Sequence, residues 1–178
     1  QEPMTALNPV LRVGEQIEEV LNMHSDLSRT EAKARTIDMM EQVHLPDVER
    51  IYAAFPHQLS GGQRQRIMIA MALILDPDLL IADEPTTALD VTTQLQILKL
   101  ISEMQERHGT AVLFITHDMG VVAEIADTVS VMQKGRIVES APIRQLLTAP
   151  KEDYTRKLLQ AVPNLDPRPP RAPAEARN

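Results

Sequence analysis

The feature that most constrains the fold is a strand–helix–strand pattern between residues 79 and 115. Short apolar runs at 79–82 and 111–115 flank the segment 91–107, in which apolar side chains recur at helical spacing, namely Ile97, Leu98, Ile101 and Met104. Short apolar runs that end in polar residues are typical of buried parallel strands. Because parallel neighbours need a helical crossover, the pattern predicts a right-handed βαβ unit and therefore an α/β fold.

The chain before this unit is predicted to be mostly helical. Apolar spacing predicts helices over 12–24, 28–43 and 63–75. The second of these begins with Ser28 three residues before Glu31, a pattern of reciprocal capping at a helix start. After the unit we expect a helix over 121–126, two strands around a Lys134-Gly135 turn, and short helices near 142–149 and 152–161.

Composition limits the classes of protein to consider. The 178 residues are 43% hydrophobic and 24% charged, which suits a folded domain or a large part of one and excludes wholesale disorder. The 18 basic and 25 acidic side chains give a formal net charge of −7, and only two Tyr and two Phe occur, so we expect no nucleic-acid partner. There is no cysteine, which excludes disulfides, thiolate zinc sites and a cysteine nucleophile.

Neither a membrane span nor a signal peptide is expected. The longest strictly apolar run, 67–75, has nine residues, whereas a spanning helix needs about 20. The chain opens without the basic and apolar segments of a signal peptide. Five prolines among the last sixteen residues predict a disordered tail over 163–178.

Polar residues follow both predicted parallel strands, where open α/β sheets bind their ligands. Asp83-Glu84 ends the first strand and His117-Asp118 follows the second. Adjacent carboxylates in this position suit a site for Mg²⁺ and a nucleotide, in which one holds the metal and the other polarises an attacking water. The structural alternatives are a turn with a helix cap for the two carboxylates and a structural role for His117.

A Ser-Gly-Gly-Gln run, residues 60–63, precedes the strongly apolar third helix. Exposed backbone N–H groups, a hydroxyl and the positive end of a helix dipole are the components of an anion site. The structural alternative is a flexible turn with a serine cap. Arg64 and Arg66 follow on the helix, and we expect each to be solvated or salt-bridged rather than to bind phosphate.

Taken together, these motifs resemble those of the ATP-binding cassette (ABC) ATPases. The resemblance covers about residues 1–162 and rests on the Q-loop (1–3), the signature motif (59–66), the Walker B strand (79–86), the D-loop (88–90) and the switch histidine (116–118). Residues 118–122 and 154–159 also look like the oligopeptide/dipeptide importer subfamily, which includes nickel and glutathione systems.

The resemblance implies a role for each matching residue. Asp83 would help to hold Mg²⁺, Glu84 would act as the general base on the attacking water, and His117 would contact the γ-phosphate of ATP. Gln1 would sense both the metal and the γ-phosphate. In a second group, Ser60 and Gly62, with Gly61 and Gln63 beside them, would contact the nucleotide held by the facing subunit, and Asp90 would lie at that subunit interface.

The implied fold is a partial P-loop NTPase with a mainly parallel sheet, a helical subdomain and C-terminal helices. Its expected segments are the Q-loop (1–4), the helical subdomain (5–75), the C-terminal half of the ATPase core (76–140), the C-terminal helices (141–162) and the tail (163–178). No phosphate-binding Gly-x-x-x-x-Gly-Lys-Ser/Thr motif occurs in the 178 residues, and the resemblance places it upstream of Gln1. We therefore expect this stretch alone to bind ATP weakly, to hydrolyse it negligibly and to leave apolar sheet surface uncovered.

The resemblance also implies partners and a location. A second ABC ATPase subunit, transmembrane permease subunits and, indirectly, a periplasmic or lipid-anchored solute-binding protein would be the partners. The protein would lie peripherally on the cytoplasmic face of the inner membrane. The helical region 5–58 resembles the surface on which permease helices dock, with Glu15 and Glu18 expected to be exposed on it.

Two other functions stay open at this point. A DNA-repair or chromosome-maintenance ATPase has related motifs but interrupts its domain with long coiled coils, and no sustained heptad pattern occurs in this sequence. A catalytically silent fragment acting as an interaction module would fit the missing phosphate loop, whereas the intact Glu84 and His117 argue against it.

Overall fold

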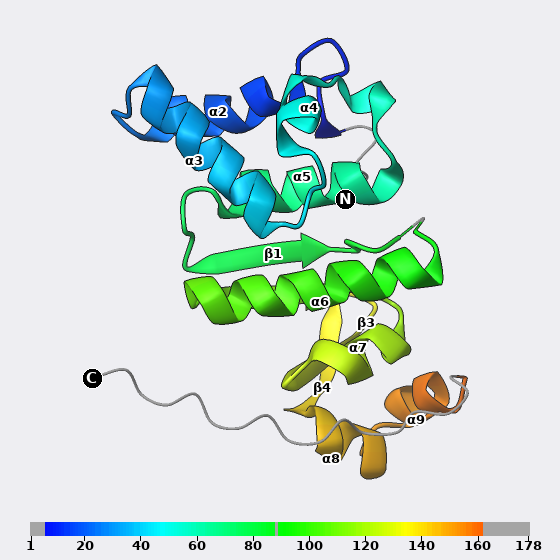
Figure 1. Ribbon diagram of the computed structural model, residues 1–178. Helices are drawn as coiled ribbons and strands as arrows, with labels where there is room; N and C mark the ends of the chain where they lie inside the picture. Colours follow the sequence, from blue (N-terminus) through cyan, green and yellow to red (C-terminus); the bar gives the residue numbers. More distant parts are fainter. Residues whose placement is uncertain (1–5, 88, 162–178) are drawn as a thin grey trace. The chain divides into compact units, whose positions relative to one another are not determined.

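The computed structural model describes residues 6–87 and 89–161, which belong to two compact units (Figure 1). The first unit ends at Ile115 and the second begins at Thr116, and each is described by itself. Gln1 and the rest of the expected Q-loop, Ala88 of the D-loop, and the expected tail over 163–178 lie outside the described residues. Elsewhere the element boundaries can be compared with the predicted ones.

The first unit is helical up to its parallel strands. In chain order its elements are α2 (Val13–His24), α3 (Arg29–Gln42), α4 (Val48–Ala53), the 3-10 turn η1 (Pro56–Gln58), α5 (Gly61–Leu73), β1 (Leu79–Asp83), α6 (Val91–His108) and β2 (Ala111–Ile115). The three predicted helices are confirmed, with α5 starting two residues earlier than expected because Ser60 caps it. The short α4 and η1 were not predicted, since their segments are too short to establish a period.

The predicted βαβ unit is confirmed. Strands β1 and β2 pair in parallel from Leu79 beside Ala111 to Asp83 beside Ile115, and α6 connects them. Gly109 ends α6 at φ +69°, a left-handed conformation that glycine adopts without a steric cost. Asp83 and Ile115, the last residues of the two strands, are paired with each other. The polar residues that follow β1 therefore begin at the carboxyl edge of this sheet.

The expectation that these strands are buried is only half right. Leu80, Val112 and Phe114 pack against the core of the first unit, whereas the alternate side chains do not. Leu79 is 52% exposed and Ile81 60% exposed, and Leu113 and Ile115 are likewise exposed. Successive side chains of a strand point to opposite faces, so one face of this two-stranded sheet is apolar and uncovered. The uncovered apolar surface that we expected at these strands is therefore present.

The predicted capping box at the start of α3 is present, because the backbone N–H of Glu31 donates to Ser28 Oγ (3.3 Å) and that of Ser28 donates to the Glu31 carboxylate (2.8 Å).

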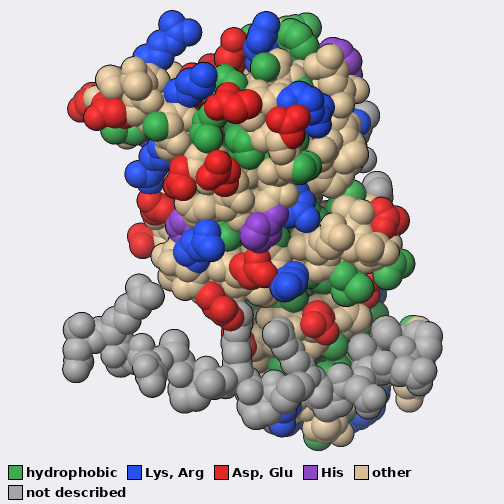
Figure 2. Space-filling view, viewed as in Figure 1, with side chains coloured by type: hydrophobic (Ala, Val, Ile, Leu, Met, Phe, Trp, Pro, Cys, Tyr) green, Lys and Arg blue, Asp and Glu red, His purple; other side chains and the backbone are tan. Residues whose placement is uncertain are grey.

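The helical part of the first unit holds a continuous apolar core. Fully buried side chains from α2, α3, α4, α5 and α6 form one cluster, among them Ile17, Met40, Ile51, Ile67 and Leu100. On the face drawn in Figure 2, acidic and basic side chains are interspersed over these helices, which is typical of a solvated surface.

One side-chain expectation in this part is wrong. Glu18 is not exposed: it is 9% accessible and accepts a hydrogen bond from the hydroxyl of Tyr52. The arginines of α5 are half-buried, and each donates to a backbone carbonyl. Arg64 donates to Leu59 O (2.8 Å), and Arg66 donates to Val43 O (2.8 Å). Burial lowers the pKa of Arg66, which stays charged at any physiological pH.

The second unit is a β-hairpin with three helices. Its elements are α7 (Met119–Ile125), β3 (Thr128–Gln133), β4 (Arg136–Pro142), α8 (Ile143–Thr148) and α9 (Asp153–Gln160). Strands β3 and β4 are antiparallel and joined by the predicted Lys134-Gly135 turn. A small core of Met119, Val131, Ala141 and Leu146 holds the unit together. Of the helices described in either unit, none has the length and apolar character needed to cross a membrane.

Candidate functional site

Glu84 is the most distinctive residue at the end of β1. Its φ angle is +46°, in the left-handed region that non-glycine residues seldom occupy. The backbone N–H of Glu84 donates to Ile115 O (2.8 Å), so Glu84 is still bonded to β2 at the point where the chain turns away from the sheet. A strained backbone of this kind costs about 1–3 kcal/mol and is retained where the surrounding structure holds it, most often at functional sites.

The turn after Glu84 orients the glutamate carboxylate. Thr87 Oγ1 donates to Glu84 Oε2 (2.8 Å), and the Thr87 backbone N–H donates to the Glu84 carbonyl (3.2 Å). Glu84 is half-buried. Sequence reasoning missed Thr87, although a hydroxyl residue three positions after the glutamate was the available signal.

The alternative of a helix cap for the two carboxylates does not hold. The next helix, α6, begins at Val91, and its N-cap is Asp90. Asp83 and Glu84 therefore do not cap it. Asp83 is the last residue of β1 and is half-buried beside Ile115.

The donor set at this strand end fits a magnesium ion. Mg²⁺ keeps several waters and takes one or two protein carboxylates together with phosphate oxygens. Asp83 supplies one such carboxylate, with Glu84 next to it. Within residues 6–87 and 89–161, no group of three or more acidic or histidine side chains forms a protein-only metal cage. An Mg²⁺ ion held by Asp83 would take further ligands from water and from phosphate oxygens.

The Ser-Gly-Gly-Gln run forms the start of α5, as predicted. The backbone N–H of Gln63 donates to Ser60 Oγ (3.3 Å), and Gln63 Oε1 accepts from the Ser60 backbone N–H (3.0 Å). Ser60 and Gly61 are exposed, while Gly62 and Gln63 are half-buried. This capping leaves the first backbone N–H groups of the helix, at Gly61 and Gly62, without an intrahelical partner.

The start of α6 lies directly against this run. A Cβ atom built on Gly62 would be 2.8 Å from Thr93 Cγ2, and one on Gly61 would be 3.6 Å from Leu89 Cδ2. The side chain of the exposed Asp90 accepts from Thr93 Oγ1 (2.6 Å) and from the Thr93 backbone N–H (3.0 Å), and these bonds lower the pKa of Asp90. The structure thus brings two predicted motifs, 60–63 and the D-loop aspartate, into one surface patch.

The residues after β2 belong to the second unit. His117 is exposed, and the Asp118 carboxylate caps α7 by accepting from the backbone N–H groups of Gly120 (2.8 Å) and Val121 (3.3 Å). The Asp118 backbone N–H donates to Thr116 Oγ1 (3.0 Å). Asp118 therefore has a structural role as a cap, and it fixes the turn on which His117 stands.

These features define a class of protein. Parallel strands that end in an acidic pair, with a strained glutamate in it and a nearby helix that opens with Ser-Gly-Gly, are the arrangement of a nucleotide-binding α/β protein. Residues 1–87 match the family model described as ABC transporter. The fold matches the dimeric ATP-binding cassette MJ0796, solved in a post-hydrolysis state with ADP and Pi. The TM-score is 0.67 at 31% identity, over 78% of this chain and 60% of that one.

Curated relatives identify the family more closely. The chain is 58% identical over 165 residues to the glutathione import ATP-binding protein GsiA of Escherichia coli (strain K12). It is 52% identical over 166 residues to the oligopeptide transport ATP-binding protein OppD of Lactococcus lactis subsp. cremoris (strain SK11). Each alignment covers 93% of this chain but only 26% of GsiA and 49% of OppD. The chain is thus similar, over 93% of its own length, to ATP-binding proteins of ABC transporters.

Proposed function

We propose that the chain is part of the ATP-hydrolysing subunit of an importer of peptides or related small solutes. The observation that carries this proposal is the strained Glu84 immediately after Asp83, with its carboxylate held by Thr87. The two import proteins aligned over 93% of the chain support the class of transported solute. The proposed activity belongs to a whole subunit, and the chain described above supplies part of it.

In this subunit Glu84 accepts the proton of the attacking water. The hydrogen bond from Thr87 to Oε2 orients the carboxylate that accepts this proton. Asp83 and Gln1 would hold Mg²⁺, which neutralises phosphate charge when it is bound. The exposed His117 would donate a hydrogen bond to the γ-phosphate of ATP.

A second surface would serve the facing ATPase subunit. The N–H groups and hydroxyl at Ser60, Gly61 and Gly62, together with Gln63, would bind the γ-phosphate of the nucleotide held there. Asp90, exposed beside them, would lie at the interface of the two subunits. The subunit pair would bind permease subunits at the cytoplasmic face of the inner membrane and act with a solute-binding protein through them.

The test is Glu84→Gln in the full-length protein that contains these residues. Glutamine keeps the shape and the Thr87 contact but cannot accept the proton. We expect ATP binding to be retained and turnover to fall about 100-fold or more. Asp83→Asn is the matched neighbour, and it should weaken the Mg²⁺ dependence of ATP binding as well as turnover. Hydrolysis at the wild-type rate in the Glu84 variant would exclude Glu84 as the base.

A further inference from the structure

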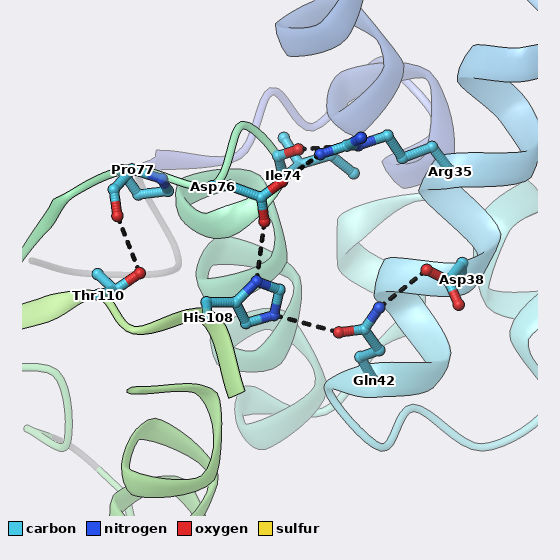
Figure 3. Close-up of polar contacts among 8 residues, drawn as sticks. All are labelled: Arg35, Asp38, Gln42, Ile74, Asp76, Pro77, His108 and Thr110. Atoms are coloured by element: carbon cyan, nitrogen blue, oxygen red, sulfur yellow. Dashed lines mark hydrogen bonds and ion pairs between the residues drawn. The ribbon is translucent and has the colours of Figure 1, made fainter. Parts of the chain in front are cut away.

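The connection between α5 and β1, residues 74–78, is held by side chains from outside it (Figure 3). Arg35 of α3 donates from Nε to Ile74 O (3.2 Å) and pairs with the Asp76 carboxylate through Nη2. His108, the last residue of α6, contacts Asp76 Oδ1 through Nδ1 (2.8 Å). Thr110, which precedes β2, donates to Pro77 O (2.8 Å). We call Arg35, Asp76, His108 and Thr110 the 74–78 clamp.

The histidine of the clamp is itself held by α3. His108 Nε2 lies 3.2 Å from Gln42 Oε1, and Gln42 Nε2 donates to Asp38 Oδ2 (2.8 Å). Because a carboxylate only accepts hydrogen bonds, Asp38 fixes the amide so that its oxygen faces the imidazole. The His108 side chain is only 12% exposed. The end of α6 is therefore joined to α3 through both Asp76 and Gln42.

Asp76 determines the shape of the connection as well as its contacts. Its φ angle is +49°, and its backbone N–H donates to Leu73 O (2.9 Å). Aspartate tolerates this left-handed conformation better than most residues. The turn leads from the last residue of α5 to β1, so its geometry sets the direction in which β1 leaves the helix.

The two elements that meet at this turn carry the two candidate motifs at their far ends. Helix α5 extends back to the capped run at Ser60, and β1 extends forward to Asp83 and Glu84. The turn is the covalent link between these elements. A displacement there is transmitted along both, because a helix and a paired strand move as rigid bodies.

We propose that Asp76 is a positioning residue, which holds α5 and β1 in a fixed relation and thereby fixes the run at Ser60 relative to Glu84. The proposal rests on the proposed function for its catalytic consequence, but its structural consequence can be measured independently. The Asp76 side chain touches neither motif, so it acts through Arg35 and His108.

The structural test compares Asp76→Gly with Arg50→Ala in the full-length protein. Glycine adopts the left-handed conformation freely, so the first variant removes the contacts of the Asp76 side chain with Arg35 and His108 without straining the turn. The second breaks the Arg50–Asp47 pair of α4 (3.1 Å), whose side chains are 56% and 62% exposed, against 44% and 52% for Arg35 and Asp76. That pair makes no contact with the 74–78 connection.

Hydrogen exchange at the backbone amides of Gln63 and Glu84 is the readout, since each amide donates a bond at its motif. We expect exchange at both amides to rise about tenfold in the Asp76 variant and to stay unchanged in the Arg50 variant. A purely stabilising pair would speed exchange at these two amides no more than at the other slowly exchanging amides of the first unit, because global unfolding exposes all of them. Such a uniform rise, or a rise confined to 74–78, would overturn the proposal.

The catalytic consequence is a separate measurement. We expect Asp76→Gly to lower kcat for ATP about tenfold with KM within twofold, because a small misplacement of reacting groups affects turnover more than binding. Asp76→Asn keeps an acceptor and tolerates the turn, and should restore kcat to within about threefold of wild type.

A wild-type protein without ATPase activity would refute the proposed function, while the exchange data would still decide the role of Asp76. Unchanged kcat in Asp76→Gly would overturn that role.

Discussion

Gly62, in the first turn of α5, packs against Thr93, in the first turn of α6. A Cβ atom on Gly62 would lie 2.8 Å from Thr93 Cγ2, closer than side chains approach one another. Thr93 cannot easily move, because its hydroxyl and its backbone N–H both donate to Asp90. The contact ties the capped run at Ser60 to the aspartate that ends the D-loop.

Gly62→Ala is therefore expected to destabilise the protein. Overpacking typically costs about 1–3 kcal/mol, which exceeds the gain of up to about 1 kcal/mol from replacing a helical glycine. Gly61→Ala is the matched control, because the same Cβ at Gly61 would make an ordinary contact of 3.6 Å with Leu89. Urea unfolding should give a lower free energy of unfolding for Gly62→Ala and an equal or higher one for Gly61→Ala. Equal values for the two variants would contradict the close packing.

Thr87→Val tests whether the hydroxyl on Glu84 matters for turnover. Valine keeps the shape of threonine but removes the 2.8 Å bond to Glu84 Oε2. We expect kcat for ATP to fall about tenfold in the full-length protein while ATP binding is retained, since a general base must be positioned to act. Thr87→Ser keeps the hydroxyl and should stay close to wild type. A loss of the same size in the serine variant would show that the methyl group, not the hydrogen bond, is responsible.

Glu139 gives a prediction about pH in the second unit. Its buried carboxylate accepts from the backbone N–H groups of Lys151 (2.9 Å) and Glu152 (3.1 Å), and these bonds hold its pKa below the ordinary value of 4.5. The stability that this carboxylate contributes is therefore present above about pH 4.5 and is lost as the pH falls through the lowered pKa.

Glu139→Gln should lower the free energy of unfolding at pH 7, and the difference from wild type should shrink below pH 4.5. Glu49→Gln, on the exposed start of α4, is the control and should change stability little. Chemical unfolding across this pH range provides the measurement. A difference that is independent of pH would mean that the charge of Glu139 is not what stabilises the unit.

The sequence predicted local structure well because periodicity and capping are local properties. The two parallel strands, the helix between them, the Ser28 box and the Lys134-Gly135 turn depend on residues a few positions apart. Contacts between distant residues left no such signal. The Tyr52–Glu18 bond joins residues 34 positions apart, and the Arg35–Asp76 pair joins residues 41 positions apart. The motif at Asp83 and Glu84 was recognisable, whereas the left-handed backbone conformation of Glu84 emerges only from the structure.

The last prediction concerns the surface proposed to meet the permease. Glu18 is buried and accepts from the Tyr52 hydroxyl, whose pKa is raised by burial and by this carboxylate. Glu15, one turn earlier on α2, is exposed. Charge reversal should therefore act differently at the two positions. Glu18→Lys buries an uncompensated charge and should destabilise the protein by about 3 kcal/mol or more. Glu15→Lys removes a weak cap from the Arg12 backbone N–H (3.3 Å) and should cost no more than about 1 kcal/mol.

Glu15→Lys is thus the variant with which to test permease docking. In vesicles that contain the permease, we expect it to weaken the dependence of ATP hydrolysis on transported solute while basal hydrolysis stays within about twofold, because a rim charge mainly affects association. Lys33→Glu, on α3 and over the Tyr52 ring, reverses a nearby charge of the opposite sign and should not reproduce the effect. If ATP hydrolysis in the Glu15→Lys variant depends on transported solute as strongly as in wild type, this end of α2 is not the docking surface.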